Sequence, residues 1–233
     1  MAVVGFLAIA VLHGLVSSGV MAINFTTMDK QFKIYTNYAQ GIAGAGFMSR
    51  NTGFTEGSSV GVAQLGLKTA RLAGLCMITT DDIGMGNVSI IIKGGVPVRG
   101  SFSDGDVVTS DAAGDPITID SEGMLAGESL AQSVDVTDMY LNATLLKGFG
   151  NKLSGLNLGE NAPHAAAGAN LDWGTTGDTV PKDGEFGLMA ESFNISGMDG
   201  SSYGVHLAGG LKLPGLKVRV VPGQATQADC ANQ

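Results

Sequence analysis

From Asn24 onward, the chain consists of short apolar runs that are separated by glycine, aspartate and asparagine. Runs of this length, bounded by residues that favour turns, are typical of β-strands. Glycine accounts for 36 of 233 residues, but no Gly-X-Y period runs through the chain, which excludes a collagen-like protein. Apolar residues make up 44% of the chain, which argues against a disordered protein. We therefore expect a mainly β protein with one folded domain.

Several segments show the alternation of apolar residues that strands require. A bulge is expected between 60–62 and 65–67, and a phase slip within 134–145. The predicted strands are 31–38, 60–62, 65–67, 87–93, 117–119, 134–145, 186–195 and 205–221. Their spacing indicates an antiparallel sandwich or a barrel-like sheet, with a β-solenoid as the alternative. Segments 101–116 and 159–184 are expected to be loops.

The first 28 residues contain no aspartate, glutamate, lysine or arginine. Their apolar run, from Ala2 to Ile23, is long enough as a helix to cross a hydrocarbon layer of ~30 Å. The run is either a signal peptide that is removed on export or a retained signal anchor. We favour the anchor: residues 1–28 would form one transmembrane helix, and residues 29–233 an extracytoplasmic β domain on a single-pass protein of the cell membrane.

Small residues recur every fourth position within this apolar segment, at Ala10, Gly14, Ser18 and Ala22. In a helix they would lie along one face, and such a face lets two helices approach closely. We therefore expect contact with membrane lipid and assembly, either with further copies of the chain or with a membrane protein partner.

The charge of the chain excludes one class of partner. There are 13 lysines and arginines against 21 aspartates and glutamates, which gives a net charge of -8. A protein that binds nucleic acid needs clustered cations to displace counterions, and no basic cluster occurs here. We expect no nucleic-acid partner.

The two cysteines are Cys76 and Cys230. An even number of cysteines in an exported domain favours a disulfide, which would tie the C-terminal tail to the middle of the domain. Two buried thiols are the alternative.

No strong catalytic or cofactor motif is present. The sequence around Ser129 lacks the second glycine of a Gly-x-Ser-x-Gly elbow, although His164 or His206 could in principle complete a triad. Four aspartates could offer oxygen ligands to calcium, but their spacing is not that of an EF-hand, and we expect a solvated acidic loop. These weak calcium candidates are Asp104, Asp106, Asp111 and Asp115. We expect no cofactor and no enzymatic activity.

Some segments of the chain resemble an uncharacterised actinobacterial family of exported, membrane-proximal proteins that often carry the automatic label "cholesterol esterase". The segments are the apolar N-terminus, 31–34, 44–47, 70–76, 184–187 with Ala190, 208–218 and Cys230. The resemblance implies a β-rich exported domain with Cys76 paired to Cys230, and it supplies no catalytic residues. The chain departs from this family because no basic residue precedes its apolar run.

These features lead to three classes of function. We expect a non-enzymatic structural or interaction protein of the cell envelope, held by its N-terminal helix and assembling with itself or with a membrane partner. A pilus-like filament subunit, with that helix as the core of the fibre, is an alternative within this class. The second class is a lipid- or sterol-binding module, which a β-sheet with an apolar pocket would suit. The third class is an ester hydrolase.

Overall fold

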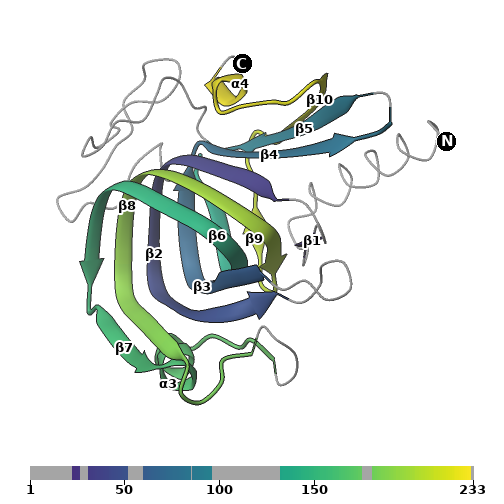
Figure 1. Cartoon of the computed structure of the whole chain (residues 1–233). Coiled ribbons are helices and arrows are strands. Elements are labelled where there is room, and N and C mark those ends of the chain that lie inside the picture. Colours follow the sequence, from purple (N-terminus) through teal and green to yellow (C-terminus); the bar gives the residue numbers. More distant parts are fainter. Residues whose placement is uncertain are drawn as a thin grey trace.

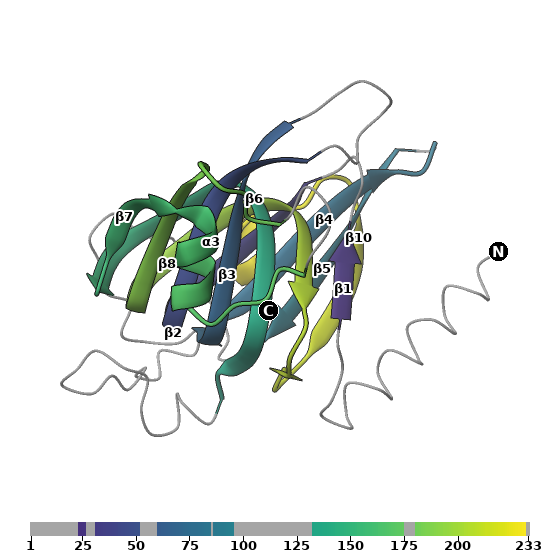
Figure 2. The ribbon, with the colours of Figure 1, turned by 90° about the horizontal axis from the view of Figure 1, so that it is seen from below.

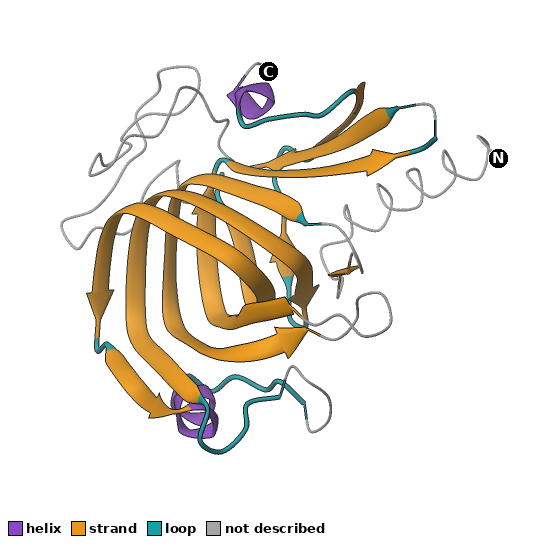
Figure 3. Cartoon of the chain, viewed as in Figure 1, coloured by secondary structure: helices purple, strands orange, loops and turns teal. Residues whose placement is uncertain are grey.

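A computed structural model describes residues 23–26, 31–51, 60–84, 86–95, 132–174 and 180–231. The strands are β1 (Ile23–Thr26), β2 (Phe32–Asn51), β3 (Val60–Ala73), β4 (Leu75–Asp82), β5 (Asn87–Gly94), β6 (Val134–Ser154), β7 (Asn157–Asn161), β8 (Phe186–Leu207), β9 (Leu211–Lys212) and β10 (Lys217–Pro222), and the helices are α3 (Ala162–Gly168) and α4 (Ala228–Ala231). Strands dominate the described part of the chain (Figure 3). The expectation of a mainly β, antiparallel protein is confirmed.

Four long strands pair in a closed cycle, which we call the ring. β2 pairs with β3, β3 with β6, β6 with β8, and β8 again with β2, and every pair is antiparallel. These strands bend strongly as they cross the molecule (Figure 1). A β-solenoid is therefore wrong for the described residues, because a solenoid stacks parallel repeats, whereas here strands far apart in sequence close on one another.

The remaining strands extend the ring at its two ends. β4, β5 and β10 form a three-stranded arm, which joins the ring where Cys76–Ile78 of β4 pair with Lys33–Tyr35 of β2. β7 pairs with β8 at the opposite end, where α3 also lies. Figures 1 and 2 both place the arm and β7 far apart.

The core lies on the inner face of the ring. Phe32 and Ile34 of β2, Val134 and Val136 of β6, and Phe193 of β8 belong to one buried cluster. The alternation that predicted strands at 31–38 and 134–145 therefore identified core positions correctly. The phase slip expected in 134–145 is confirmed at Asp138, whose φ of 50° places it in the left-handed region.

Four sequence expectations are corrected by the structure. No bulge separates 60–62 from 65–67, because β3 keeps one register with β2 from Val60 to Leu67. The expected loop 159–184 contains the end of β7 and α3. Segment 205–221 is not one strand but the end of β8, then β9 and β10. Residues Ile23–Thr26, which fell within the expected helix 1–28, form β1, because they pair with Gly204–Leu207 of β8.

Candidate ligand-binding site

Side chains alternate between the two faces of the ring, and the register shows which residues share a face. One inner-face row runs from Leu153 of β6 through Phe193, Gly41 and Ala70, and returns to β6 at Val136. Because the row ends far from its start on the same strand, the strands are strongly staggered and steeply inclined. Steep inclination lets four long strands enclose a wider space than four upright strands could.

The inner face is not completely filled. A cavity of about 120 Å³ lies inside the ring. It is lined by Ala39, Gly44, Ala45, Leu65, Leu67, Leu72, Leu141, Leu146, Leu153, Leu188, Ala190, Phe193, Ile195 and Met198, all of them apolar. Leu146 and Leu153 are also exposed to solvent, so the cavity reaches the surface beside the C-terminal half of β6. We call this opening the mouth.

Two glycines of β2 make room on this face. A Cβ atom at Gly41 would overlap the ring of Phe193, and one at Gly46 would lie 2.7 Å from a methyl group of Leu65. Both contacts are closer than side-chain carbons allow. The glycine-rich part of β2 therefore lets large side chains of β8 and β3 lie across it, at the wall of the cavity.

A second, smaller cavity of about 50 Å³ lies between the ring and the arm, with Met77 of β4 and Ile92 of β5 among its lining residues. It shares three wall residues with the first cavity, namely Leu72, Leu141 and Met198. Met198 is therefore part of the wall of both spaces.

Part of the outer face of the ring is polar. One outer row contains Lys152, Asn194, Gln40, Arg71 and Asp135 on successive strands, and Arg71 Nε lies 3.5 Å from Asp135 Oδ1. Where this row crosses the sheet, the apolar interior of the ring suits an apolar ligand and the outer face does not.

The segment after α3 packs against the outer face of the ring through an aromatic cluster. The ring of Trp173 lies 5.2 Å from that of Phe47 and 5.1 Å from that of Tyr140. Tyr140 Oη also accepts a hydrogen bond of 3.0 Å from the backbone N–H of Asp172. Burial raises the pKa of Tyr140, so this hydroxyl stays neutral at physiological pH.

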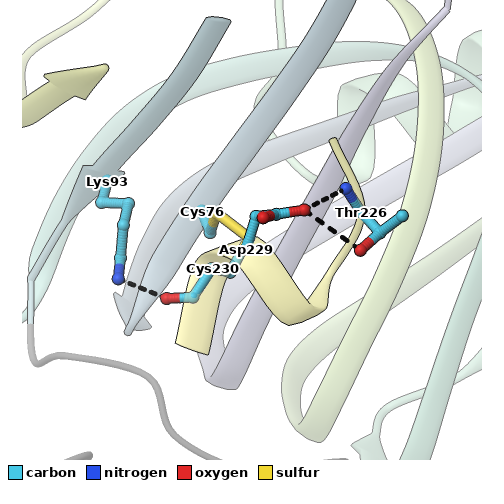
Figure 4. Close-up of a disulfide and its surroundings, with 5 residues drawn as sticks. All are labelled: Cys76, Lys93, Thr226, Asp229 and Cys230. Atoms are coloured by element: carbon cyan, nitrogen blue, oxygen red, sulfur yellow. Dashed lines mark hydrogen bonds between the residues drawn. A yellow bond between two sulfur atoms is a disulfide. The ribbon is translucent and has the colours of Figure 1, made fainter. Parts of the chain in front are cut away.

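The disulfide lies at the other end of the molecule, on the arm (Figure 4). Cys76 of β4 and Cys230 of α4 are bonded, and both are fully buried, which confirms the expected pair. Lys93 Nζ donates a hydrogen bond to the backbone oxygen of Cys230. Burial, followed by the charges of Lys217 and Arg219, lowers the pKa of Lys93.

Most of the remaining predicted site residues are not brought together. His164 is exposed on α3, and His206 is exposed near the end of β8, where its ring lies 5.9 Å from that of Tyr140. Ser129, the four calcium candidates and the small residues Ala10, Gly14, Ser18 and Ala22 lie outside the described residues. Within the described ranges, no group of three metal-ligating side chains occurs.

Sequence patterns did not reveal the cavity, because two of its features carry no local signal. Glycines in β2 break the apolar alternation, and the ring is closed by pairs that are distant in sequence. The usable signal was the surplus of apolar residues, including ten methionines.

A family of unknown function, DUF6230, matches residues 28–231 of the chain. The chain belongs to this family. The match covers both cysteines of the disulfide and every described strand except β1. No curated protein and no solved structure matches the chain. None of the helices in the described part of the chain is both long and apolar enough to span a membrane. Residues 1–22 of the expected helix 1–28 lie outside that part.

Proposed function

We propose that the protein binds a single apolar chain, such as the acyl chain of a lipid, inside the ring. The observation that carries this proposal is the entirely apolar cavity that opens at the mouth. An apolar cavity of about 150 Å³ in a protein core stays dry and binds a ligand of the size of benzene. A cavity of about 120 Å³ therefore suits the end of an acyl chain. The rest of the acyl chain would lie across Leu146 and Leu153.

The free energy of binding would come from burial of methylene groups, at about 0.8 kcal/mol for each. No charged or hydrogen-bonding side chain is among the described residues that line the cavity. The site would therefore select for length and thickness of an apolar chain, and not for its head group. A rigid sterol nucleus is much wider than the cavity, so we favour a flexible chain over a sterol.

A cavity-filling substitution tests this proposal. Ala190 is buried in β8, opposite Gly44, and lines the cavity. Ala190→Leu should fill about the volume of two to three methylene groups and weaken binding of a fluorescent polyene fatty acid about tenfold, since 1.4 kcal/mol corresponds to a factor of ten. Fluorescence titration of the full-length chain measures this effect.

The matched control is Ala167→Leu, the same change at an exposed position of α3. It keeps the N-terminal apolar segment and every cavity residue, so its affinity should equal that of the parent protein. Equal affinity of all three proteins would place the fatty acid outside the cavity and would refute the proposal. Thermal melting of Ala190→Leu separates loss of the site from loss of the fold.

The remaining expected functions stay predictions. Assembly in the cell envelope, alone or as a pilus-like filament, depends on the small-residue face within 1–22, which lies outside the described residues. Ester hydrolysis would need Ser129, which also lies outside them. Neither has a described observation in its favour, and actinobacterial origin likewise rests on the resemblance alone.

A further inference from the structure

Two apolar cavities, of about 120 Å³ and about 50 Å³, share part of their walls. The shared wall consists of Leu72 of β3, Leu141 of β6 and Met198 of β8, and we call these three side chains the partition. All three are buried, with exposed fractions of 2%, 3% and 4%. An apolar chain that lies in the larger cavity therefore meets the partition before it reaches the smaller one.

The partition spans the ring from one side to the other. β3 and β8 each pair with β2 and β6, so these two strands lie opposite each other across the interior. Leu72 and Met198 therefore enter the interior from opposite strands, and Leu141 enters it from a strand between them. All three belong to the same buried cluster. The partition is thus built by packing across the interior and not by neighbours on one strand.

A glycine in β8 directs Met198 into the interior. Phe193 and Ile195 pack in the core, and strict alternation along the strand would place residue 197 beside them. The backbone of Gly197 instead has a φ of 62°, in the left-handed region that glycine adopts readily, and Met198 takes the place in the core. This local irregularity puts a long, unbranched side chain at the boundary between the two cavities.

The partners of Met198 on the adjacent strands cannot replace its side chain. They are Gly148 of β6, which has no side chain, and Thr36 of β2. The Thr36 hydroxyl donates a hydrogen bond of 2.6 Å to the backbone oxygen of Ala73, which holds this side chain in place. Truncation of Met198 should therefore leave an opening in the partition, because a core relaxes only partially when buried atoms are removed.

We propose that the partition limits the length of the apolar chain that the larger cavity accepts, and that Met198 sets this limit. The inference deepens the proposed function and rests on it, because it states which chains the same site would take. A cavity of about 150 Å³ holds the six carbon atoms of benzene, so the larger cavity holds about five carbon atoms of a straight chain. Affinity should rise with chain length up to the limit and then level off, because further methylene groups would lie outside the cavity and its mouth.

A series of straight-chain fatty acids that differ only in length tests the limit. Competition with the fluorescent polyene fatty acid, on the full-length chain, measures the affinity for each member. In the parent protein, affinity should rise about fourfold for each added methylene group that is buried, and then level off. In Met198→Ala it should level off at a chain at least about two carbon atoms longer, because the smaller cavity becomes part of the site.

Met139→Ala is the matched control. Among the described residues that line the two cavities, Met139 of β6 belongs to the smaller cavity alone. The substitution removes the same atoms from the same buried cluster and leaves the partition intact, so its length limit should equal that of the parent. Met198→Leu, which keeps a large apolar side chain in the partition, should also keep the parent limit.

The loss of a buried methionine side chain lowers stability, so thermal melting of each variant must show that it is folded at the temperature of the titration. If Met198→Ala is unfolded there, Leu72→Ala opens the same partition from β3 and should move the limit in the same direction.

The two proposals fail separately. Fatty-acid binding with the same length limit in the parent, the partition variant and Met139→Ala would overturn the role of the partition and leave the proposed function intact. A limit that moves equally in Met198→Ala and Met139→Ala would also overturn it, by showing that general loosening of the core changes the limit. Absence of fatty-acid binding in the parent would refute the proposed function itself, and this inference with it.

Discussion

Gly41 illustrates how a single residue shapes the interior of the ring. Its neighbours on adjacent strands are Phe193 and Ala70, and the ring of Phe193 occupies the space in which a side chain of residue 41 would stand. The backbone oxygen of Thr69 lies only 2.6 Å from the same point. A flexible side chain could move aside, but a backbone oxygen within a paired strand cannot, so this position requires glycine.

Gly41→Ala should lower the free energy of unfolding by about 2–3 kcal/mol, because it overpacks the core against a fixed backbone. Gly61→Ala is the matched control, since no atom lies within 4 Å of its Cβ position, and it should change stability by less than about 1 kcal/mol. Denaturant unfolding monitored by circular dichroism measures both. Equal stability of the two variants would contradict this prediction, because it would show that the backbone around Gly41 can move to accommodate a Cβ atom.

At the scale of elements, sequence patterns identified strands where apolar residues alternate and missed them where glycine or polar residues replace them. Phe32 and Ile34 marked the start of β2, but its continuation to Asn51 contains glycines that give no alternation. β8 was predicted as two pieces, 186–195 and the start of 205–221, because Gly197 and Gly200 interrupt the pattern within a continuous strand. In both cases cross-strand pairing, which the local pattern cannot reveal, sustains the strand.

The C-terminal tail is an element that is held by polar contacts as well as by its disulfide. Asp229 Oδ2 accepts hydrogen bonds from the backbone N–H of Thr226 at 2.8 Å and from its hydroxyl at 3.2 Å, as in a capping box at the start of α4 (Figure 4). Ser89 Oγ of β5 donates to the backbone oxygen of Gly223 and accepts from the N–H of Ala225. The tail is therefore joined to the arm at several points along its length.

Asp229→Asn should reduce thermal stability at neutral pH and cease to matter in acid. The hydrogen bond from the Thr226 backbone is the main cause that lowers the pKa of Asp229 below its ordinary value of 3.8. A carboxylate with a lowered pKa stabilises the fold above its unfolded pKa, and this contribution disappears as the pH falls through the folded pKa. The difference in Tm between the two proteins should therefore shrink below pH 3.8. A difference that stays constant from pH 7 to pH 2 would contradict this assignment.

At the scale of the whole molecule, the two ends of the ring differ in how they are packed. Apolar residues at one end leave the cavity open, while the arm and the tail at the other end form a second buried cluster with Tyr35, Cys76, Ile78, Ile91 and Cys230. The alternating apolar runs predicted the class of fold, and the even number of cysteines in an expected exported domain favoured the disulfide, because both signals are local or depend on residue type. The cavity could not be predicted in the same way, since it depends on how far four strands are staggered when they close.

Removing the disulfide should destabilise the molecule without closing the cavity. The bond joins residues 154 apart in sequence, and in the chain-entropy model closure of a loop of that length stabilises the fold by about 5 kcal/mol. Cys76→Ala with Cys230→Ala should therefore unfold at clearly lower denaturant concentration. The arm meets β2 through a short stretch of pairing at Lys33–Tyr35, and no residue of the arm lines the 120 Å³ cavity, so the fatty-acid affinity of the still-folded variant should equal that of the parent. A reduced parent protein provides the chemical control and should match the variant in both measurements. Loss of fatty-acid binding under conditions in which the variant remains folded would mean that the arm and the cavity are coupled through the ring.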